Sequence, residues 1–265
     1  MSTPATSRMP AVFLGHGTPM NALDTNRYSE TWQRFGASIP KPRAILVVSA
    51  HWVTRGIAVT AMEAPRTIHD FGGFPQALFD MEYPAPGSPA LAQRVHDLLA
   101  PREVHLDRSW GLDHGTWSVL VHAFPKADIP VVQLSIDGTQ PAQFHYALGQ
   151  ELAPLRDEGV LIVGSGNVVH NLRTARRTEA AAPYDWALQF NQSVREHVQR
   201  GEHAPLIAYE EAGQAARMSV PSAEHYLPLL YVIAQQQEGE TASIITDGID
   251  LGSISMLSVA VGAAL

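Results

Sequence analysis

The chain has 265 residues, 45% hydrophobic and 17% charged, a composition typical of globular proteins rather than of disordered chains or coiled coils. Its 26 acidic and 18 basic side chains give a formal net charge of −8. That balance argues against a binder of nucleic acid or of anionic membranes, since both need basic surfaces. The chain has no cysteine, which excludes disulfides, thiolate metal sites and a cysteine nucleophile. The 12 histidines are the first indication of function.

The N-terminal segment does not resemble a targeting signal. Residues 1–10 carry one arginine and no apolar core of the signal-peptide kind. No run of about 18 apolar residues, the length that a membrane-spanning helix needs, occurs in the chain. We therefore expect a flexible N-terminal tail over residues 1–10, one folded domain over residues 11–265, and a cytoplasmic location.

Short apolar runs rich in β-branched residues are spread along the chain, and such runs are typical of strands buried on both faces of a parallel sheet. Helical patterns lie between them, and strands that alternate with helices predict an α/β fold. We therefore expect a single domain with a central, mostly parallel β-sheet flanked by helices. The expected strands are residues 11–14, 44–48, 57–61, 129–134, 160–163, 243–246 and 254–261. The expected helices are residues 88–100, 140–156, 183–200 and 221–237, the last with a kink at Pro228.

Residues 65–89 are rich in glycine, proline and aromatic residues, which predicts a long and mostly irregular connection. Long connections of this kind often form the lid or wall of a functional site. A packed surface loop is the alternative, and the sequence favours neither.

Histidines follow three of the predicted strands. His16, His51 and His170 each lie shortly after the end of an apolar run. Ligands of open α/β sheets bind beyond the carboxyl ends of the strands, so these imidazoles are expected at one edge of the sheet. His225 lies near the start of the last predicted helix, and His114 lies in a predicted tight turn. These two are candidates for the same site.

A single histidine in such a position is more often a hydrogen-bonded structural residue than a metal ligand. For the five candidate histidines taken together, metal binding becomes the better interpretation, because neutral imidazole is the commonest protein ligand for metals. Three protein ligands with open coordination positions are typical of a catalytic site rather than a structural one. The other histidines are interpreted as structural; they are His69, His96, His105, His122, His145, His197 and His203, of which His96, His145 and His197 are expected on solvated helix faces.

Two carboxylates, Asp113 and Glu224, stand next to candidate histidines in the sequence. Such carboxylates often accept the second N–H of a metal-binding imidazole and so orient it. The simpler alternative is that both are turn and helix-cap residues.

Six segments together resemble the class III extradiol ring-cleavage dioxygenases of the LigB superfamily, and more narrowly their bacterial 4,5-DOPA-dioxygenase-like branch. The segments are FLGHGTPMNAL, ILVVSAHW, IHDFGGFP, LDHGTWSVL, VLIVGSGNVVHNL and EHYLPLLYV. They occur in the expected order and span nearly the whole chain. The resemblance implies that residues 11–265 form a LigB-like catalytic domain with its metal site at the C-terminal ends of the strands.

The resemblance also implies a ligand set, in which His16, His51 and His225 bind the metal. Relatives outside this branch often use a glutamate as the third ligand, which gives the two-histidine, one-carboxylate triad of non-haem iron enzymes. Glu224, adjacent to His225, keeps that alternative open.

The same resemblance implies that His170 is the active-site acid/base, close enough to serve as a fourth ligand in a resting zinc form. It implies that His114 binds substrate or dioxygen. The implied reaction inserts O2 next to the diol of a catechol and opens the ring to a semialdehyde. It requires Fe(2+), whereas Zn(2+) occupying the same imidazoles in the purified protein would not support this redox chemistry.

The partners expected are a small catecholic substrate and O2, with no nucleic acid and no membrane, and the sequence leaves the formation of a homo-oligomer open. Two other functions compete with this one: a zinc-dependent hydrolase in which His170 or Glu224 activates a metal-bound water, and a non-catalytic metal-binding member of the same fold. Five aromatic residues are candidates for the walls of a catechol pocket, with core packing as the alternative: Trp52, Phe71, Phe74, Trp117 and Tyr226.

Overall fold

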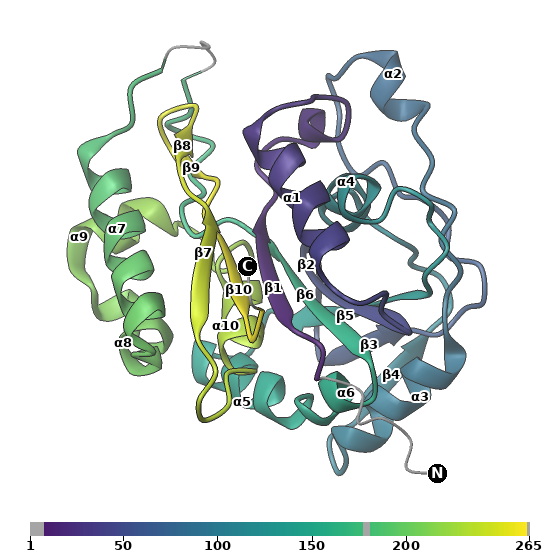
Figure 1. Ribbon diagram of the computed structural model, residues 1–265. Coiled ribbons are helices and arrows are strands. Elements are labelled where there is room, and N and C mark those ends of the chain that lie inside the picture. The colour runs from purple at the N-terminus through teal and green to yellow at the C-terminus, as the bar shows by residue number, and fades with distance from the viewer. Residues whose placement is uncertain (1–7, 177–180, 264–265) are drawn as a thin grey trace.

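The computed structural model describes residues 8–176 and 181–263, and in this part of the chain a large sheet separates two layers of helices (Figure 1). The strands of that sheet are β1 (Ala11–Gly15), β2 (Ala44–Thr54), β3 (Ile57–Thr60), β4 (Val104–Asp107), β5 (Val131–Asp137), β6 (Val160–Gly166), β7 (Ala242–Thr246) and β10 (Ser258–Val261). A small separate hairpin consists of β8 (Ile249–Asp250) and β9 (Ile254–Ser255).

The large sheet has eight strands in the order β4-β3-β5-β2-β6-β1-β10-β7. Its centre is parallel, because β5, β2, β6 and β1 all pair in the same direction. Antiparallel pairs join β3 to β5 and attach β10 and β7 beside β1. The predicted α/β fold with a central, mostly parallel sheet is confirmed.

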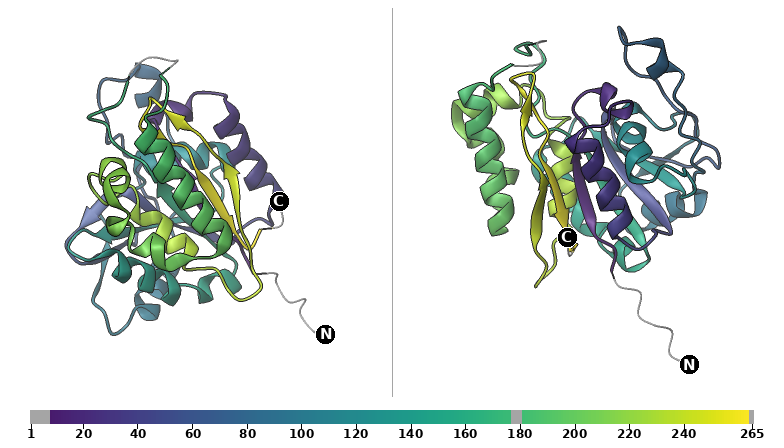
Figure 2. Two further views of the ribbon diagram at one scale, coloured as in Figure 1. Left: turned by 90° about the vertical axis from the view of Figure 1, so that its left-hand side faces the viewer. Right: turned by 45° about the horizontal axis from the view of Figure 1, so that its top comes forward.

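Helices cover both faces of the sheet, as the two views of Figure 2 also show. Each face has its own buried apolar cluster, and side chains that alternate along one strand belong to opposite clusters, as Val12 and Phe13 of β1 do. The helices are α1 (Arg27–Ser38), α2 (Gln76–Phe79), α3 (Pro89–Leu98), α4 (His114–Ala123), α5 (Ala142–Glu151), α6 (Pro154–Asp157), α7 (Asp185–Arg200), α8 (His203–Ile207), α9 (Gly213–Ser219) and α10 (Leu227–Ile233), with the 3-10 turns η1 (Pro19–Ala22) and η2 (Tyr209–Glu211).

One predicted helix begins, and another ends, at the residue whose capping chemistry indicates it. Ser88 caps α3 through a hydrogen bond from the backbone N–H of Leu91, and Pro89 occupies the first turn. At the end of α7, Gly201 adopts a left-handed conformation with φ of 67°, which suits a residue without a Cβ atom. Capping chemistry therefore predicted these boundaries well.

Prolines divide or shorten the other two predicted helices. The helix expected over residues 140–156 is interrupted, and Pro154 begins the separate α6. The helix expected over residues 221–237 is only α10 (Leu227–Ile233), and Pro228 lies in its first turn. A proline there loses no helical hydrogen bond, so Pro228 opens the helix instead of kinking it, and the predicted kink is wrong.

Other differences concern short or buried elements. The strand expected over residues 254–261 is two strands, β9 and β10. The elements that were not predicted are the helices α1, α2, α4, α8 and α9 and the strands β4 and β8. His145 on α5 is buried instead of solvated, and its Nδ1 atom lies 2.9 Å from the hydroxyl oxygen of Tyr231. His96 and His197 are partly exposed, as predicted.

The predicted N-terminal tail lies partly outside the described residues, which begin at residue 8. Arg8 forms an ion pair with Asp157, and Met9 is buried with its backbone N–H donating to the carbonyl of Arg156. Residues 8–10 are thus packed against the domain. Among the residues described, no helix combines the length and the apolar character needed to span a bilayer.

A glycine at the end of β6 allows the close approach of the segment before α10. A Cβ atom added to Gly166 would lie 2.2 Å from the carbonyl oxygen of His225, whereas one added to Gly72 would meet nothing within 4 Å. We expect Gly166→Ala to lower the free energy of unfolding by about 1–3 kcal/mol, because a backbone atom must move to admit the methyl group. Gly72→Ala is the control and should stay within about 0.5 kcal/mol of the wild type.

Urea denaturation of both variants measures this difference. Equal unfolding midpoints for Gly166→Ala and the wild type would show that the segment carrying His225 is not held against β6.

Candidate metal centre

Three histidines from distant parts of the chain converge at the carboxyl ends of the central strands. Each of His16, His51 and His225 offers a ring nitrogen, and these three atoms all lie within 4.8 Å of one another. The Nε2 atoms of His16 and His51 are 3.3 Å apart. The hairpin β8–β9 and the segment that contains α2 stand at this same end of the molecule (Figure 1).

The strands β1 and β2 position two of these rings, those of His16 and His51. His16 follows β1, and its backbone N–H donates to the carbonyl of Gly166 at the end of β6. His51 lies within β2 at the point where its pairing with β5 is irregular, between Val48 and Val53. Such an interruption of the ladder changes the direction of a side chain, and here it accompanies a histidine that belongs to the site.

The position of His225 depends on backbone contacts with β6. The carbonyl of His225 accepts a hydrogen bond from the backbone N–H of Asn167 and packs against Gly166. The main chain on both sides of the β6 terminus thus fixes His16 and His225 relative to each other.

A serine hydroxyl determines the tautomer of His16. The Oγ atom of Ser165 donates to the carbonyl of Gly115, and it lies 2.9 Å from Nδ1 of His16. Since the hydroxyl proton is already used, Ser165 accepts the proton on Nδ1. The lone pair of His16 is therefore on Nε2, the atom that faces His51.

Carboxylates stand in the same relation to the other two rings. The Oε1 atom of Glu224 lies 3.3 Å from Nδ1 of His225. The Oδ2 atom of Asp70 lies 3.5 Å from Nδ1 of His51. A carboxylate in such a position favours a proton on Nδ1 and a lone pair on Nε2, and this arrangement is common around metal-binding histidines.

These contacts allow a direct test of whether a metal fits. The Nε2 atom of His225 is buried and has no hydrogen-bond partner among the described residues. The Nε2 atoms of His16 and His51 face each other at 3.3 Å, where they can share one proton or, once that proton leaves, both offer a lone pair to the same cation. A divalent cation would give the Nε2 atom of His225 a partner and would accept the lone pairs of His16 and His51 at the same point. The donor set fits a metal ion.

Burial keeps all three imidazoles neutral. Desolvation lowers the pKa of His16 and of His225 well below the ordinary value, and the neighbouring imidazoles lower each pKa further. The pKa of His51 is lowered to about 4, first by burial and then by the His114 ring, against the opposing effect of nearby carboxylates. Neutral imidazole is the form that binds metal.

His170 lies beside this group. Its ring stacks on that of His225, with centroids 3.4 Å apart and planes 6° apart. Its backbone N–H donates to the carbonyl of Ser219, and it forms an isolated antiparallel bridge with Ile254 of β9. Burial, and then the His51 ring, lower the pKa of His170 to about 4. His170 is therefore neutral at pH 7.

His114 lies on the other side, next to His51, with ring centroids 3.8 Å apart. It is the first residue of α4 and does not lie in the tight turn that the sequence suggested. Asp113 caps this helix by accepting the backbone N–H of Thr116, so it is a cap residue. Of the two carboxylates considered from the sequence, Glu224 is therefore the one that contacts an imidazole.

Sequence reasoning missed two residues of the site, Ser165 and Asp70. Asp70 accepts a hydrogen bond from the backbone N–H of His114 at 2.9 Å, and its Oδ1 atom lies 3.0 Å from Nδ1 of that ring. The only sequence signal for Asp70 was its place in the segment IHDFGGFP. Nothing in the local spacing connects it with His114, which lies 44 residues later.

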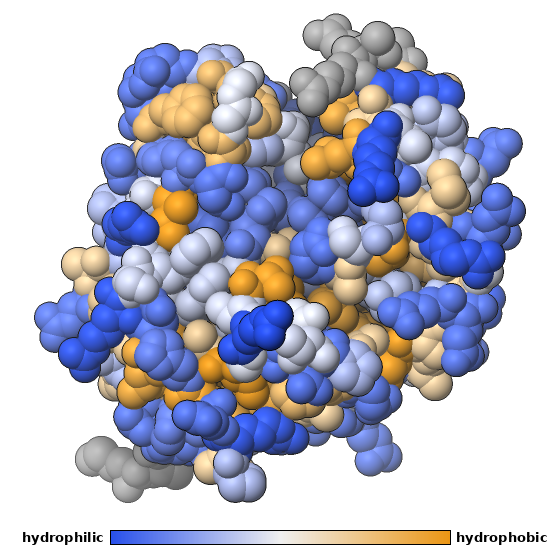
Figure 3. All heavy atoms as spheres, turned by 180° about the vertical axis from the view of Figure 1, so that it is seen from behind, coloured by the Kyte–Doolittle hydropathy of each residue, from blue (hydrophilic) through white to orange (hydrophobic). Residues whose placement is uncertain are grey.

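The irregular segment over residues 65–89 does form one wall of the site. Phe71 stands edge-on to the His114 ring at a centroid distance of 5.5 Å, and Phe74 packs on Phe71. Figure 3 shows hydrophobic side chains gathered over the segment that contains α2. The other aromatic candidates pack in the interior: Trp52 stacks on Trp110, Trp117 is fully buried, and Tyr226 packs on Tyr209.

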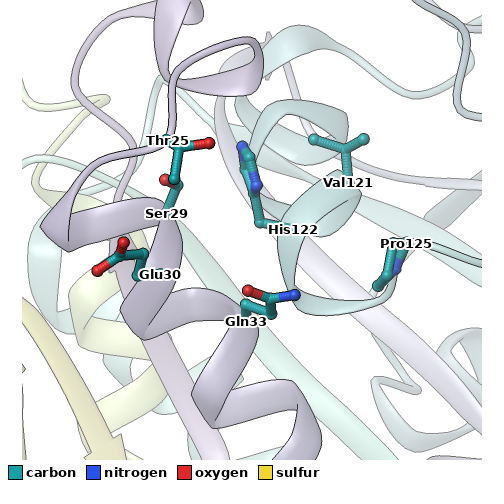
Figure 4. A pocket seen from close by; sticks show the side chains of 7 residues that line it. All are labelled: Thr25, Ser29, Glu30, Gln33, Val121, His122 and Pro125. Atoms are coloured by element: carbon teal, nitrogen blue, oxygen red, sulfur yellow. The ribbon is translucent and has the colours of Figure 1, made fainter.

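A separate cavity of about 220 Å³ lies between α1 and α4 (Figure 4). Its lining includes Glu30, Gln33 and His122, and it contains none of the clustered histidines. The Nε2 atom of His122 lies 2.7 Å from the carbonyl oxygen of Asn21, which agrees with a structural role.

The sequence profile of the family described as "Catalytic LigB subunit of aromatic ring-opening dioxygenase" matches residues 6–261. The chain belongs to the LigB family. Members of this family are metal-dependent enzymes that act on a small molecule and O2, so the expected class III extradiol ring-cleavage dioxygenase is confirmed.

Relatives of this LigB-family protein cover almost its whole length. It is 55% identical over 262 residues to "4,5-DOPA dioxygenase extradiol" of Escherichia coli (strain K12), which covers 97% of this chain and 96% of that protein. It is 40% identical over 251 residues to "4,5-DOPA dioxygenase extradiol" of Beta vulgaris, with 92% of each chain covered. A crystal structure of an uncharacterized protein from Escherichia coli K12 matches with a TM-score of 0.84 and 50% identity, covering 96% of this chain and 99% of that one.

The lowered pKa values of the three histidines predict how the LigB-family site takes up metal. At pH 6, a histidine with an ordinary pKa is about three-quarters protonated, so three such ligands would release about two protons on binding zinc. We expect release of well under one proton here, because burial already keeps the rings neutral. Zinc titration calorimetry of the metal-free protein, in buffers of different ionisation enthalpy, counts these protons. Release of two would contradict the assigned neutral state.

Proposed function

We propose that this protein inserts O2 next to the diol of a DOPA-like or related catechol and opens the ring to a semialdehyde. In this proposal Fe(2+) is the active metal, and residues 11–265 are the catalytic domain. This proposal rests on the arrangement of the histidines. Three neutral imidazoles have ring nitrogens within 4.8 Å of one another, and the neutral His170 and the buried His114 lie beside them. The names of the relatives support a DOPA-like substrate.

His16, His51 and His225 would hold the metal through nitrogen lone pairs alone. When bound, Fe(2+) would lower the pKa of the catechol hydroxyls as a Lewis acid and relay electron density from catecholate to O2. Glu224 belongs to a different close group, with His170 and His225, and does not join His16 and His51. This arrangement supports the histidine, rather than the glutamate, as third ligand.

His170 is assigned as the acid/base. It is neutral at pH 7, the form that can accept a proton, and because its pKa is lowered to about 4 the transfer needs a catechol hydroxyl that a bound Fe(2+) would have made more acidic. Its stacking on His225 holds the ring beside the proposed ligands. The same closeness supports a role for His170 as a fourth ligand in a resting zinc form.

His114 is assigned to substrate or dioxygen binding. It is buried, and it lies between the proposed ligand His51 and the Phe71 ring. An aromatic substrate would thus meet a polar imidazole and an apolar ring on the same side of the site. Such a combination orients a ring while excluding water from it.

The direct test is anaerobic loading with Fe(2+), followed by L-DOPA and air. We expect oxygen uptake and a yellow semialdehyde product from the iron form, and none from the zinc form, because Zn(2+) is redox-inert. Ester hydrolysis by the zinc form, without oxygen uptake by the iron form, would favour a hydrolase instead.

A single substitution tests the assignment of His170. His170→Gln should retain metal, since the three other imidazoles remain, and should lose turnover by about 10²–10⁴-fold. His203→Gln is the matched control, because His203 lies on α8 and contacts Tyr146 and Gln236, away from the cluster. Wild-type turnover by the iron-loaded His170→Gln variant would remove the acid/base role.

A further inference from the structure

Among the described residues, Asp70 is the carboxylate that contacts both His51 and His114. Its Oδ1 atom faces His114, at 2.9 Å from the backbone nitrogen and 3.0 Å from Nδ1, and its Oδ2 atom faces Nδ1 of His51 at 3.5 Å. The three side chains form a close group whose facing atoms lie within 4.8 Å of one another. The carboxylate is 20% exposed, so water screens these contacts only in part.

The two rings need such an acceptor. The Nδ1 atom of His114 is buried and makes no hydrogen bond among the described residues, but the Oδ1 atom of Asp70 lies only 3.0 Å away, where a small rotation of the ring would bring the N–H into line with it. A buried N–H without an acceptor costs about 1–3 kcal/mol. Without a carboxylate, either ring could move its proton to Nε2, which would remove the lone pair that faces the site.

The segment that carries Asp70 is anchored independently of its carboxylate. The indole N–H of Trp117 donates to the carbonyl of Ile68, and the backbone N–H of Ile68 donates to the carbonyl of Leu112. Thr67 forms an isolated parallel bridge with Leu112. Because these contacts already hold the main chain, the loop does not depend mainly on the Asp70 side chain to stay in place.

We propose that Asp70 is a positioning residue that keeps both His51 and His114 in the tautomer with the proton on Nδ1. One carboxylate then presents the Nε2 lone pair of His51 to the metal and that of His114 to the substrate. This inference rests on the proposed function for the identity of what the two rings bind. Asp70 would then position both a metal ligand, His51, and the substrate-binding histidine, His114.

Nitrogen-15 NMR of the histidine side chains in the metal-free wild-type protein at pH 7.5 tests the tautomers directly. We expect His51 and His114 to show a protonated Nδ1 and an unprotonated Nε2. A protonated Nε2 on either ring would overturn the proposal, and this measurement requires no variant to fold.

Zinc titration of the metal-free Asp70→Asn variant provides the second measurement. The amide oxygen can still accept the backbone N–H of His114, but the uncharged side chain no longer offers two acceptor oxygens to two imidazoles. We expect zinc affinity to fall by about 10–100-fold and His51 to gain the tautomer protonated on Nε2. Zinc affinity equal to that of the wild type would contradict the proposal.

Asp107→Asn is the matched control for this variant. Asp107 is 18% exposed and accepts backbone N–H groups of Ser109 and Trp110, so it resembles Asp70 in burial and in holding a loop. Its substitution should change zinc affinity less than threefold, whatever it does to stability. An equal loss of affinity in both variants would reduce Asp70 to a structural residue.

These measurements use zinc alone, with no catechol and no O2, so they separate the two proposals. If the tautomers and the zinc affinities follow expectation but the iron form consumes no oxygen, the proposed function fails and the role of Asp70 towards His51 stands. If the iron form cleaves catechols while Asp70→Asn binds zinc like the wild type, only the inference about Asp70 fails.

Discussion

Burial of neutral imidazoles that face one another is the constraint on which the rest of this structure depends. His16 and His225 are almost fully removed from water, and the Nε2 atoms of His16 and His51 approach to 3.3 Å. Without a cation this arrangement is costly, because the imidazoles are desolvated and the Nε2 atom of His225 has no partner among the described residues. A divalent metal bound between these rings would remove that cost.

The oxygen acceptors behind the rings make the arrangement specific. Ser165, Asp70 and Glu224 each face a different Nδ1 atom and so direct the three lone pairs toward a common point. Two of these acceptors come from places that the parallel sheet alone does not supply: a long irregular segment and the turn before α10. The sheet therefore brings the histidines to one edge, and the connecting segments contribute the oxygen acceptors that orient the imidazoles there.

Much of this arrangement could be predicted from the sequence. Apolar strands predicted the sheet, and histidines placed just after them predicted which edge carries the site, because every parallel strand ends on the same side. The role of Asp70 could not be predicted in this way, since its contact with His114 joins a loop to a helix 44 residues away and leaves no periodic signal. The burial of His145 was missed for a related reason: its partner, Tyr231, lies on α10 and is 86 residues distant.

X-ray absorption spectroscopy of the iron-loaded protein would show whether the three histidines bind one metal, because it counts the imidazoles around the iron. We expect one iron per chain with three histidine nitrogens in its inner shell and oxygen atoms in the remaining positions. A spectrum with one imidazole or none, or an iron content far below one per chain after anaerobic loading, would contradict it.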